Sequence, residues 1–371
     1  MVKDKISRLS EIDTPALLIE RGILERNITR MQQLALENGV TLRPHIKTHK
    51  MPRLAGIQIE AGADGIAVAK LGEAEVMADA GIKDIQIANQ IVGEIKFQRL
   101  LDLTRRTHVS VAVDSRENLA DLSRFFAAHN QTLDVLIEID SGLHRSGIDD
   151  IEQVVRLARD IEGAPGVRFV GLMTHAGHAY AAADFDEVAK IGKYEGEFMD
   201  EIATALREEG ITVDVVSVGS TPTAPYSSAI PGVTELRVGN YIFNDAMQVQ
   251  LGSATFDDCA LTVLSTVISV PAEYRAIIDA GSKALAAERG AHGNAKLSGF
   301  GHIPGKNATL DRLSEEHGVI LFENESFVIG ERLRIIPNHA CSVTNLFDFA
   351  YMIDSDEVTE VVPIAARGKM T

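Results

Sequence analysis

Four basic side chains alternate along one short segment of the chain. Arg43, His45, Lys47 and His49 stand at every second position of the run RPHIKTHK, residues 43–50. On a strand alternate side chains share a face, so these four groups would lie together. Crowding and burial both disfavour the charged form of Lys47, and a lysine with a lowered pKa is a nucleophile toward aldehydes. The row predicts Schiff-base chemistry at Lys47, with Lys50 on the other face as the rival. A solvated basic edge or a plain phosphate patch is the alternative.

A second pair of residues has the spacing of metal ligands. His339 and Cys341 are separated by one residue in a strand-like stretch, so both side chains can face one ion. A thiolate with an imidazole suits zinc better than manganese or magnesium. Two protein ligands leave positions for water or a substrate hydroxyl, as a catalytic metal needs. Taken alone, such a pair is usually coincidence.

The elements that must position these residues alternate between short β-branched runs and helical stretches. Strands are predicted at 41–47, 64–69, 84–88, 108–113, 133–139, 168–174, 213–218 and 235–238, each but the last followed by a helical stretch. Eight such units predict an α/β fold, a TIM-like (β/α)8 barrel over residues 22–250. A doubly wound open sheet is the competing arrangement, and no early Gly-rich fingerprint supports it.

After about residue 250 the helical period fades. Strand-like segments follow at 260–270, 275–278, 326–329, 333–336 and 360–362, and an early strand at 14–19 precedes the first barrel helix. We therefore expect a mostly β C-terminal domain that is formed by residues 1–21 and 251–371 and carries the metal pair.

Two loops of the predicted barrel could bind phosphate. Barrel enzymes frequently bind phosphate with the loops after strands seven and eight. Small and hydroxyl-bearing residues there let backbone N–H groups approach an anion. In this chain those loops contain Gly219, Ser220 and Thr221, and then Gly239, Asn240 and Tyr241. Within the barrel context they predict a phosphate site; an ordinary strand-to-helix turn is the alternative.

Composition bounds the class of protein. The 371 residues are 45% hydrophobic and carry a formal net charge of −17. The acidic balance argues against nucleic acids and anionic membranes as partners. Two cysteines are too few for a disulfide framework, and no segment resembles a signal peptide or a membrane span. We expect a cytoplasmic protein.

Several motifs together resemble one known family. The run RPHIKTHK resembles the cofactor-lysine motif of the D-threonine aldolase and D-serine dehydratase group, which are alanine-racemase-like, fold-type III pyridoxal-phosphate enzymes. Further matches follow in the family's order at DTP (13–15), THAGH (174–178), PNHAC (337–341) and AARG (365–368). The resemblance covers nearly the whole chain. It implies pyridoxal 5′-phosphate (PLP) on Lys47, a barrel followed by a β domain, and a homodimer.

The resemblance also implies roles for side chains after strands five and six. It places Arg145 near the pyridine nitrogen, where a permanently protonated guanidinium would leave that nitrogen unprotonated. The ring would then be a weaker electron sink, which fits a reaction that a metal assists. Of His175, His178 and Tyr180, we expect one to pack on the cofactor or contact the substrate. A buried, hydrogen-bonded histidine pair is the alternative.

The metal pair bears on the reaction. Both branches of the family carry a divalent metal at this place, with His and Asp in some aldolases and His and Cys in the dehydratases. This chain has Cys341 where the His–Asp form has aspartate. A thiolate ligand favours zinc over manganese or magnesium, and the His–Cys pair points toward the dehydratase branch.

The expected activity is that of a PLP- and metal-dependent lyase acting on D-3-hydroxy amino acids. We favour the D-threonine aldolase type, which gives glycine and an aldehyde, because the whole-chain resemblance is closest there. The main alternative is a D-serine or D-3-hydroxyaspartate dehydratase, which gives a keto acid and ammonia. Lys47 would carry either reaction, with His45, His175 or a metal-bound water as a further base. An amino-acid racemase and a non-catalytic PLP carrier rank lower.

Overall fold

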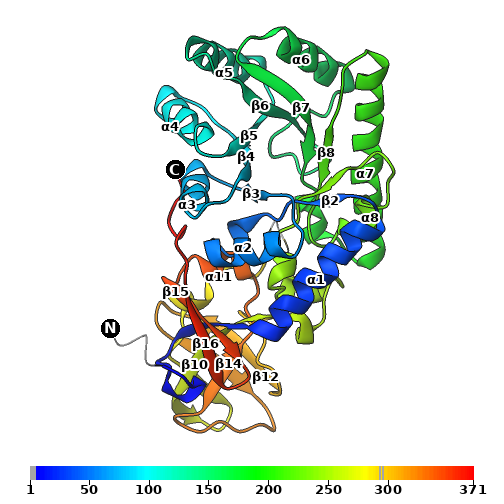
Figure 1. Cartoon of the computed structure of the whole chain (residues 1–371). Coiled ribbons are helices and arrows are strands. Elements are labelled where there is room, and N and C mark those ends of the chain that lie inside the picture. The colour runs from blue at the N-terminus through cyan, green and yellow to red at the C-terminus, as the bar shows by residue number, and fades with distance from the viewer. Residues whose placement is uncertain (1–5, 292–293, 295) are drawn as a thin grey trace.

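The computed structural model describes residues 6–291, 294 and 296–371, which form two sheets with the associated helices. In Figure 1 the second sheet lies beyond one end of the first, and α2 and α11 lie between the two. Among the described residues no helix has the length and apolar character needed to cross a membrane.

The first sheet is parallel and follows the predicted strands closely. Its order is β2-β9-β8-β7-β6-β5-β4-β3. Its strands are β2 (Thr41–Leu42), β3 (Ile66–Val68), β4 (Asp84–Gln90), β5 (His108–Val113), β6 (Leu133–Ile139), β7 (Val167–Thr174), β8 (Val215–Val218) and β9 (Glu235–Leu236). Backbone hydrogen bonds from Asp64 N to Leu42 O and from Ala67 N to Pro44 O join the two ends, which closes the barrel. The predicted α/β barrel is confirmed.

Helices cover the outside of this barrel because each has one apolar stripe. In α6 the residues Val154, Leu157, Ala158 and Ile161 are buried, and Asp150 caps the first turn by accepting from Gln153 N. The barrel helices are α1 (Arg21–Glu37), α2 (Pro52–Glu60), α3 (Leu71–Asp79), α4 (Glu94–Thr104), α5 (Arg116–Ala128), α6 (Ile151–Gly163), α7 (Phe185–Glu208), α8 (Ala224–Ser227) and α9 (Ala246–Gln250).

The second sheet is mostly antiparallel, as expected for the C-terminal part. It runs β12-β13-β11-β10-β1-β15-β16, with β14 paired to β10. Its strands are β1 (Ala16–Glu20), β10 (Leu261–Ala272), β11 (Arg275–Ile278), β12 (Ala308–Leu313), β13 (Gly318–Phe322), β14 (Arg332–Ile335), β15 (Phe349–Asp354) and β16 (Glu357–Pro363), with the short helices α10 (Ser282–Leu285) and α11 (Ala340–Thr344). The early strand β1 lies in this sheet between β10 and β15, whereas the domain limits at 21/22 and 250/251 stay a prediction.

The predicted strand at 326–329 is wrong. Phe327 packs against Phe322, but Val328 and Ile329 are exposed and pair with no strand. Three apolar residues of this segment gave a strand-like pattern, yet only one of them reaches the core. The strands β12 and β13 were also missed. Charged residues interrupt the apolar pattern of β12, whereas β13 is a short apolar run, GVILF, without alternation.

A network of charged side chains lies at the start of several barrel strands. Arg43, which directly follows β2, pairs with Asp84 and Glu235, the first residues of β4 and β9. His108 bridges Asp84 and Asp134 at 3.0 and 2.8 Å, and the hydrogen bonds to the two carboxylates raise its pKa to about 9. This network lies at the end of the barrel opposite the C-terminal ends of the strands. In barrel enzymes, residues at this end usually contribute to stability and not to catalysis.

We expect His108→Gln to lower the free energy of unfolding at pH 6 but hardly at all near pH 10. Folding raises the pKa of His108, so its stabilising effect is complete below the ordinary pKa of about 6.5. The effect is lost as the pH rises through about 9. Because half of the ring is exposed, we expect a difference of only about 1 kcal/mol. Urea unfolding of both proteins at the two pH values measures it; an equal loss at both would show that the charge of His108 contributes nothing.

Candidate active site

A cavity of about 490 Å³ opens at the C-terminal ends of the barrel strands, next to the segment that carries His339 and Cys341. Barrel enzymes have their active sites at this face. The predicted residues that line it are His45, Lys47, Arg145, His175, Tyr180, Gly219, Ser220, Thr221, Gly239, Asn240, His339 and Cys341. Residues separated by almost 300 positions in the chain thus share one cavity.

Lys47 lies in a 3₁₀ turn, η3 (Ile46–Thr48), and not on a strand as predicted. Pro44 has no N–H to extend the ladder, and the side chain of His45 accepts a hydrogen bond from Lys47 N at 3.3 Å, which caps the turn. The pKa of Lys47 is lowered chiefly by burial, with the positive charges of Arg145 and Arg237 adding to the effect. The nucleophilic character expected for this amine is therefore supported by its surroundings.

The prediction that the four alternating basic residues share one face is wrong. Only His45 and Lys47 line the cavity. Arg43 belongs to the ion pairs at the strand starts, and His49 is buried against Gln58 at 3.1 Å. The ladder hydrogen bonds continue to His45, whose N–H donates to Val238 O, and the 3₁₀ turn begins at Ile46. The two-residue period therefore ends at His45, and the later side chains of the row take other directions.

Lys50, the alternative to Lys47 as the cofactor lysine, forms an ion pair outside the cavity. Its Nζ lies 2.9 Å from the carboxylate of the buried Glu73, and it does not line the cavity. Glu73 also accepts hydrogen bonds from the backbone of Ala69 and Lys70. The pair therefore ties the turn that carries Lys47 to the start of α3.

The loops after β8 and β9 form the floor of the cavity. Gly219 has a φ of +144°, and an added Cβ there would lie 3.1 Å from the backbone of Arg237. At Gly239 a Cβ would lie 2.8 Å from the carbonyl oxygen of His45. These two close approaches require glycine. The side-chain hydroxyl of Thr221, from the first loop, accepts a hydrogen bond from the Tyr241 N–H in the second.

A buried carboxylate supports the first of these loops. Glu195 of α7 accepts hydrogen bonds from the backbone N–H groups of Ala176 and Gly219 at 3.1 and 3.0 Å, and from the hydroxyl of Thr223 at 2.9 Å. Burial raises the pKa of Glu195, and these hydrogen bonds oppose that effect. Sequence reasoning missed this residue, since a glutamate within a helix has no distinguishing signal.

Tyr241 and His178, both predicted as cofactor contacts, lie outside the cavity lining. The Tyr241 hydroxyl accepts a hydrogen bond from Gln58 at 2.8 Å in the protein interior. The ring of His178 packs over Gly142. Tyr241 directly follows Asn240, and His178 lies two residues before Tyr180, and both Asn240 and Tyr180 line the cavity. The motifs therefore gave the right segments, but not the direction of each side chain.

His175 and Tyr180 line the cavity as predicted. Nδ1 of His175 donates to the carbonyl oxygen of Gly219 at 2.8 Å, so a neutral ring presents Nε2 as an acceptor. Burial, followed by the charge of Lys47, puts the pKa of His175 well below its ordinary value, and the same causes act on His45. Both imidazoles are thus neutral at neutral pH.

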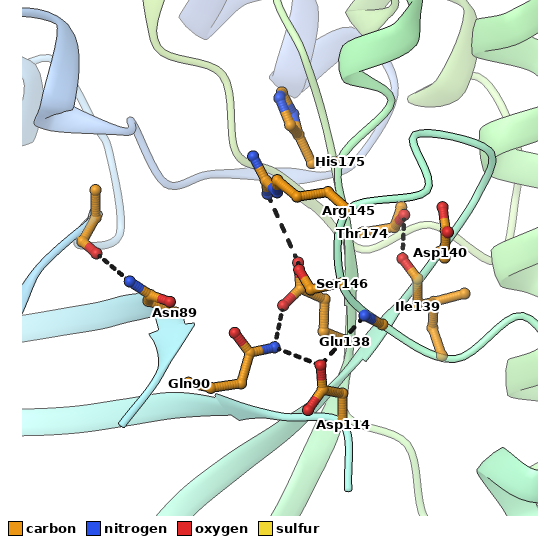
Figure 2. Close-up of polar contacts among 12 residues, drawn as sticks. Asn89, Gln90, Asp114, Glu138, Ile139, Asp140, Arg145, Ser146, Thr174 and His175 are labelled. Atoms are coloured by element: carbon orange, nitrogen blue, oxygen red, sulfur yellow. Dashed lines mark hydrogen bonds and ion pairs between the residues drawn. The ribbon is translucent and has the colours of Figure 1, made fainter. Parts of the chain in front are cut away.

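Arg145 belongs to a polar network at the ends of β4, β5 and β6 (Figure 2). Its guanidinium lies 3.7 Å from Glu138, and Ser146 donates to the same carboxylate at 3.0 Å. Gln90 donates to Glu138 and, at 2.9 Å, to Asp114. About half of the Arg145 side chain is exposed, so Glu138 restrains a side chain that would otherwise be mobile.

Arg237, which sequence reasoning missed, is a second arginine in the cavity and is fully enclosed. One of its guanidinium nitrogens donates to the carbonyl of Thr174. Its Nε is buried and has no hydrogen-bond partner among the described residues. A buried donor without a partner is costly, which indicates a ligand atom at this point. An arginine between the apolar residues Leu236 and Val238, directly after β9, was a usable signal in the sequence.

His339 and Cys341 lie at the start of α11, not on a strand. Nδ1 of His339 donates to Glu288 at 2.8 Å, and the thiol of Cys341 hydrogen-bonds with Thr48 at 3.3 Å. Burial opposes ionisation of Cys341, but His339 and Lys47 lower the pKa of its thiol overall. Within the described part of the chain no group of three or more His, Cys, Asp or Glu side chains is arranged to hold a metal ion.

These features fit a catalytic divalent metal. A thiol poised to ionise and an imidazole oriented by a carboxylate are typical zinc ligands, and the remaining positions would be open. Thr48 of the Lys47 turn touches Cys341, so the metal pair and the lysine are neighbours.

Comparisons with known proteins agree with this geometry. The model of the alanine racemase N-terminal domain matches residues 19–246, and that of a putative serine dehydratase domain matches residues 260–353. A D-threonine aldolase of an Arthrobacter species is 35% identical over 97% of this chain and 94% of its own. A D-threo-3-hydroxyaspartate dehydratase of Delftia is 37% identical over 90% and 92%.

This chain belongs to the D-threonine aldolase and D-serine dehydratase family. That family is one of PLP-dependent lyases with an alanine-racemase-like fold, so the predicted enzyme class is confirmed.

Solved structures of this family superpose along almost the whole chain. The D-threonine aldolase of Filomicrobium marinum gives a TM-score of 0.91 at 32% identity and covers 98% of each chain. A cysteine-to-alanine variant of D-threo-3-hydroxyaspartate dehydratase in the metal-free form gives 0.90 at 34% identity, over 96% of this chain and 98% of its own.

Proposed function

We propose that this chain is a PLP- and divalent-metal-dependent lyase that acts on D-3-hydroxy amino acids, and that it is an aldolase of the D-threonine type. The observation that carries the proposal is that Lys47, His339 and Cys341 line one cavity. Thr48, the residue after Lys47, is hydrogen-bonded to Cys341. The match to the Arthrobacter aldolase over nearly its full length supports the retro-aldol reaction. One solved structure of a relative carries a cysteine-to-alanine substitution and is in the metal-free form. This supports a metal at Cys341.

The cofactor would be held by Lys47, by the loops at Gly219–Thr221 and Gly239–Asn240, and by Arg237. When bound, PLP withdraws electrons from the bond that breaks at the substrate α-carbon. We assign Arg237 rather than Arg145 to the ring nitrogen. Its buried Nε–H has no partner among the described residues, whereas Arg145 is half exposed and paired with Glu138.

The protein groups supply the proton transfers. Lys47, with its lowered pKa, can exchange a proton with the substrate α-carbon. In the retro-aldol reaction it gives a proton to this carbon after the aldehyde has left, and in dehydration it takes the α-proton. His175 can accept the proton of the 3-hydroxyl at Nε2, since its Nδ1 is held by Gly219. His45 accepts from Lys47 N, so its neutral ring carries hydrogen on Nε2 and serves as a donor. A metal held by His339 and Cys341 would lower the pKa of the hydroxyl.

Dehydration is the second candidate reaction, and Cys341 is the observation that favours it. A metal that holds the 3-hydroxyl can also help hydroxide to leave, once Lys47 has taken the α-proton. The Delftia relative, 37% identical, is a D-threo-3-hydroxyaspartate dehydratase.

Product identification tests the proposal. The purified protein is incubated with D-threonine and with D-serine, with and without EDTA. Acetaldehyde and glycine from D-threonine, lost with EDTA, are the expected result. Pyruvate and ammonia from D-serine would instead establish the dehydratase, and turnover of neither substrate would contradict the proposed substrate class.

We expect Arg237→Gln to weaken PLP binding at least about tenfold, and Arg145→Gln to weaken it much less. A buried charged hydrogen bond is worth about 1.5–3 kcal/mol, which corresponds to at least about a tenfold change in Kd. Arg145 is solvated and loses less. Fluorescence titration of each cofactor-free variant with PLP measures the two Kd values. A larger increase in Kd for Arg145→Gln would indicate that Arg145, and not Arg237, contacts the ring nitrogen.

Two further properties remain proposals. The family resemblance supports a homodimer, which sedimentation velocity would test. A cytoplasmic location, predicted from the sequence, would be tested by cell fractionation.

A further inference from the structure

The buried carboxylate of Asp245 joins two distant segments of the site. It lies between η5 (Asn240–Ile242) and α9, with no exposed surface. Its Oδ2 accepts hydrogen bonds from Asn240 Nδ2 at 2.6 Å and from Ala340 N at 2.9 Å. Asn240 belongs to the second phosphate loop, and Ala340 is the residue between His339 and Cys341. One carboxylate oxygen therefore contacts both the cofactor loop and the metal segment.

Backbone hydrogen bonds strengthen the link on the metal side. Ala246 N donates to Pro337 O at 3.1 Å, and Met247 N donates to Asn338 O at 3.3 Å. The other oxygen of Asp245 caps α9 by accepting from Gln248 N at 3.0 Å. The first turn of α9 and residues 337–340 thus form one hydrogen-bonded unit, and Asp245 connects it to Asn240.

The contact also orients Asn240. Its amide nitrogen is bound to Asp245, which leaves Oδ1 as a buried atom without a partner among the described residues. Asn240 lines the cavity, so the hydrogen bond decides which end of the amide meets a ligand.

We propose that Asp245 is a positioning residue that couples cofactor binding to metal binding. The inference rests on the proposed function, because it takes PLP and a divalent metal as the two ligands. Oδ2 reaches both donors only when the cofactor loop and the metal segment hold one relative position. A ligand that fixes one of the two segments therefore also fixes the other through Asp245, so the first to bind reduces the ordering cost of the second. Such coupling is reciprocal.

The test compares the Kd of each ligand with the other present and absent. PLP binding is titrated by fluorescence in zinc-loaded and chelator-treated protein, and zinc binding is measured by competition with a chromophoric chelator. In the wild type we expect each ligand to lower the Kd of the other by about tenfold. Asp245→Ser keeps an acceptor that can cap α9 but is too short to bridge Asn240 and Ala340. Its coupling factor should fall to about one.

A matched control and a second variant complete the design. Asp150→Ser makes the same change at the N-cap of α6, where Asp150 accepts from Gln153 N at 2.8 Å, and should keep wild-type coupling. Asn240→Ala removes the bridge from the cofactor side, so it should also abolish coupling while the zinc affinity of PLP-free protein stays unchanged. Asn240→Ala therefore still tests the coupling if Asp245→Ser does not fold.

The outcomes separate the inference from the proposed function. Wild-type protein that binds both ligands independently, or variants that keep the coupling, would overturn the role of Asp245 and leave the lyase proposal intact. Wild-type protein that binds neither ligand would overturn both.

Discussion

Replacing Lys47 with alanine is expected to remove the visible absorbance of lysine-bound PLP and to lower kcat/KM at least about a thousandfold, even with added PLP. The lysine both anchors the cofactor and is the group with a lowered pKa beside the substrate space. The fold should persist, because the ammonium of Lys47 makes no ion pair among the described residues and the 3₁₀ turn is held by the backbone and by His45. Absorbance spectra, steady-state kinetics and thermal unfolding measure the three effects.

Borohydride reduction followed by peptide mass spectrometry supplies the control. In the wild type the pyridoxyl group should be found on Lys47 and not on Lys50 or Lys70. Lys50→Gln should still label Lys47, although the buried Glu73 would lose its partner and the protein would unfold at a lower temperature. A label on Lys50 or Lys70 would contradict the assignment.

The barrel could be read from the sequence because its strands are buried and its helices are amphipathic. Both patterns follow from local geometry, so β5 and β6 have the predicted limits of 108–113 and 133–139. The turn at Lys47 could not be read in this way. Residues 42–47 continue the strand pattern in the sequence, but the ladder ends at His45, whose side chain caps the 3₁₀ turn that begins at Ile46.

The side chains that complete the site were mostly missed. Glu195 and Asp245 act through contacts with residues far along the chain, and these become visible only when the barrel is assembled. Arg237 also acts through such a contact, but its charge between two apolar residues could have marked it in the sequence. The motif residues were found because several short matches occur in order. A motif gives the segment but not the direction of each side chain, and the structure has the side chains of His178 and Tyr241 outside the cavity lining.

Removal of the metal is the second change with a large expected effect. Chelation should abolish turnover, and zinc should restore it. Cys341→Ala and His339→Ala should each lose at least about a hundredfold in kcat/KM, because one remaining protein ligand cannot hold the ion at working concentrations. Metal content by mass spectrometry should fall with activity in both variants.

The two cysteines provide an internal control for this result. His339 and Lys47 lower the pKa of the Cys341 thiol against the effect of burial, whereas burial raises that of Cys259. In chelated protein iodoacetamide should therefore modify Cys341 much faster than Cys259, since the thiolate is the nucleophile. Bound zinc should protect Cys341 from iodoacetamide, because the metal would coordinate its sulfur. Equal labelling of Cys341 with and without zinc would show that this thiol is not a ligand, and the dehydratase alternative would lose the observation that favours it.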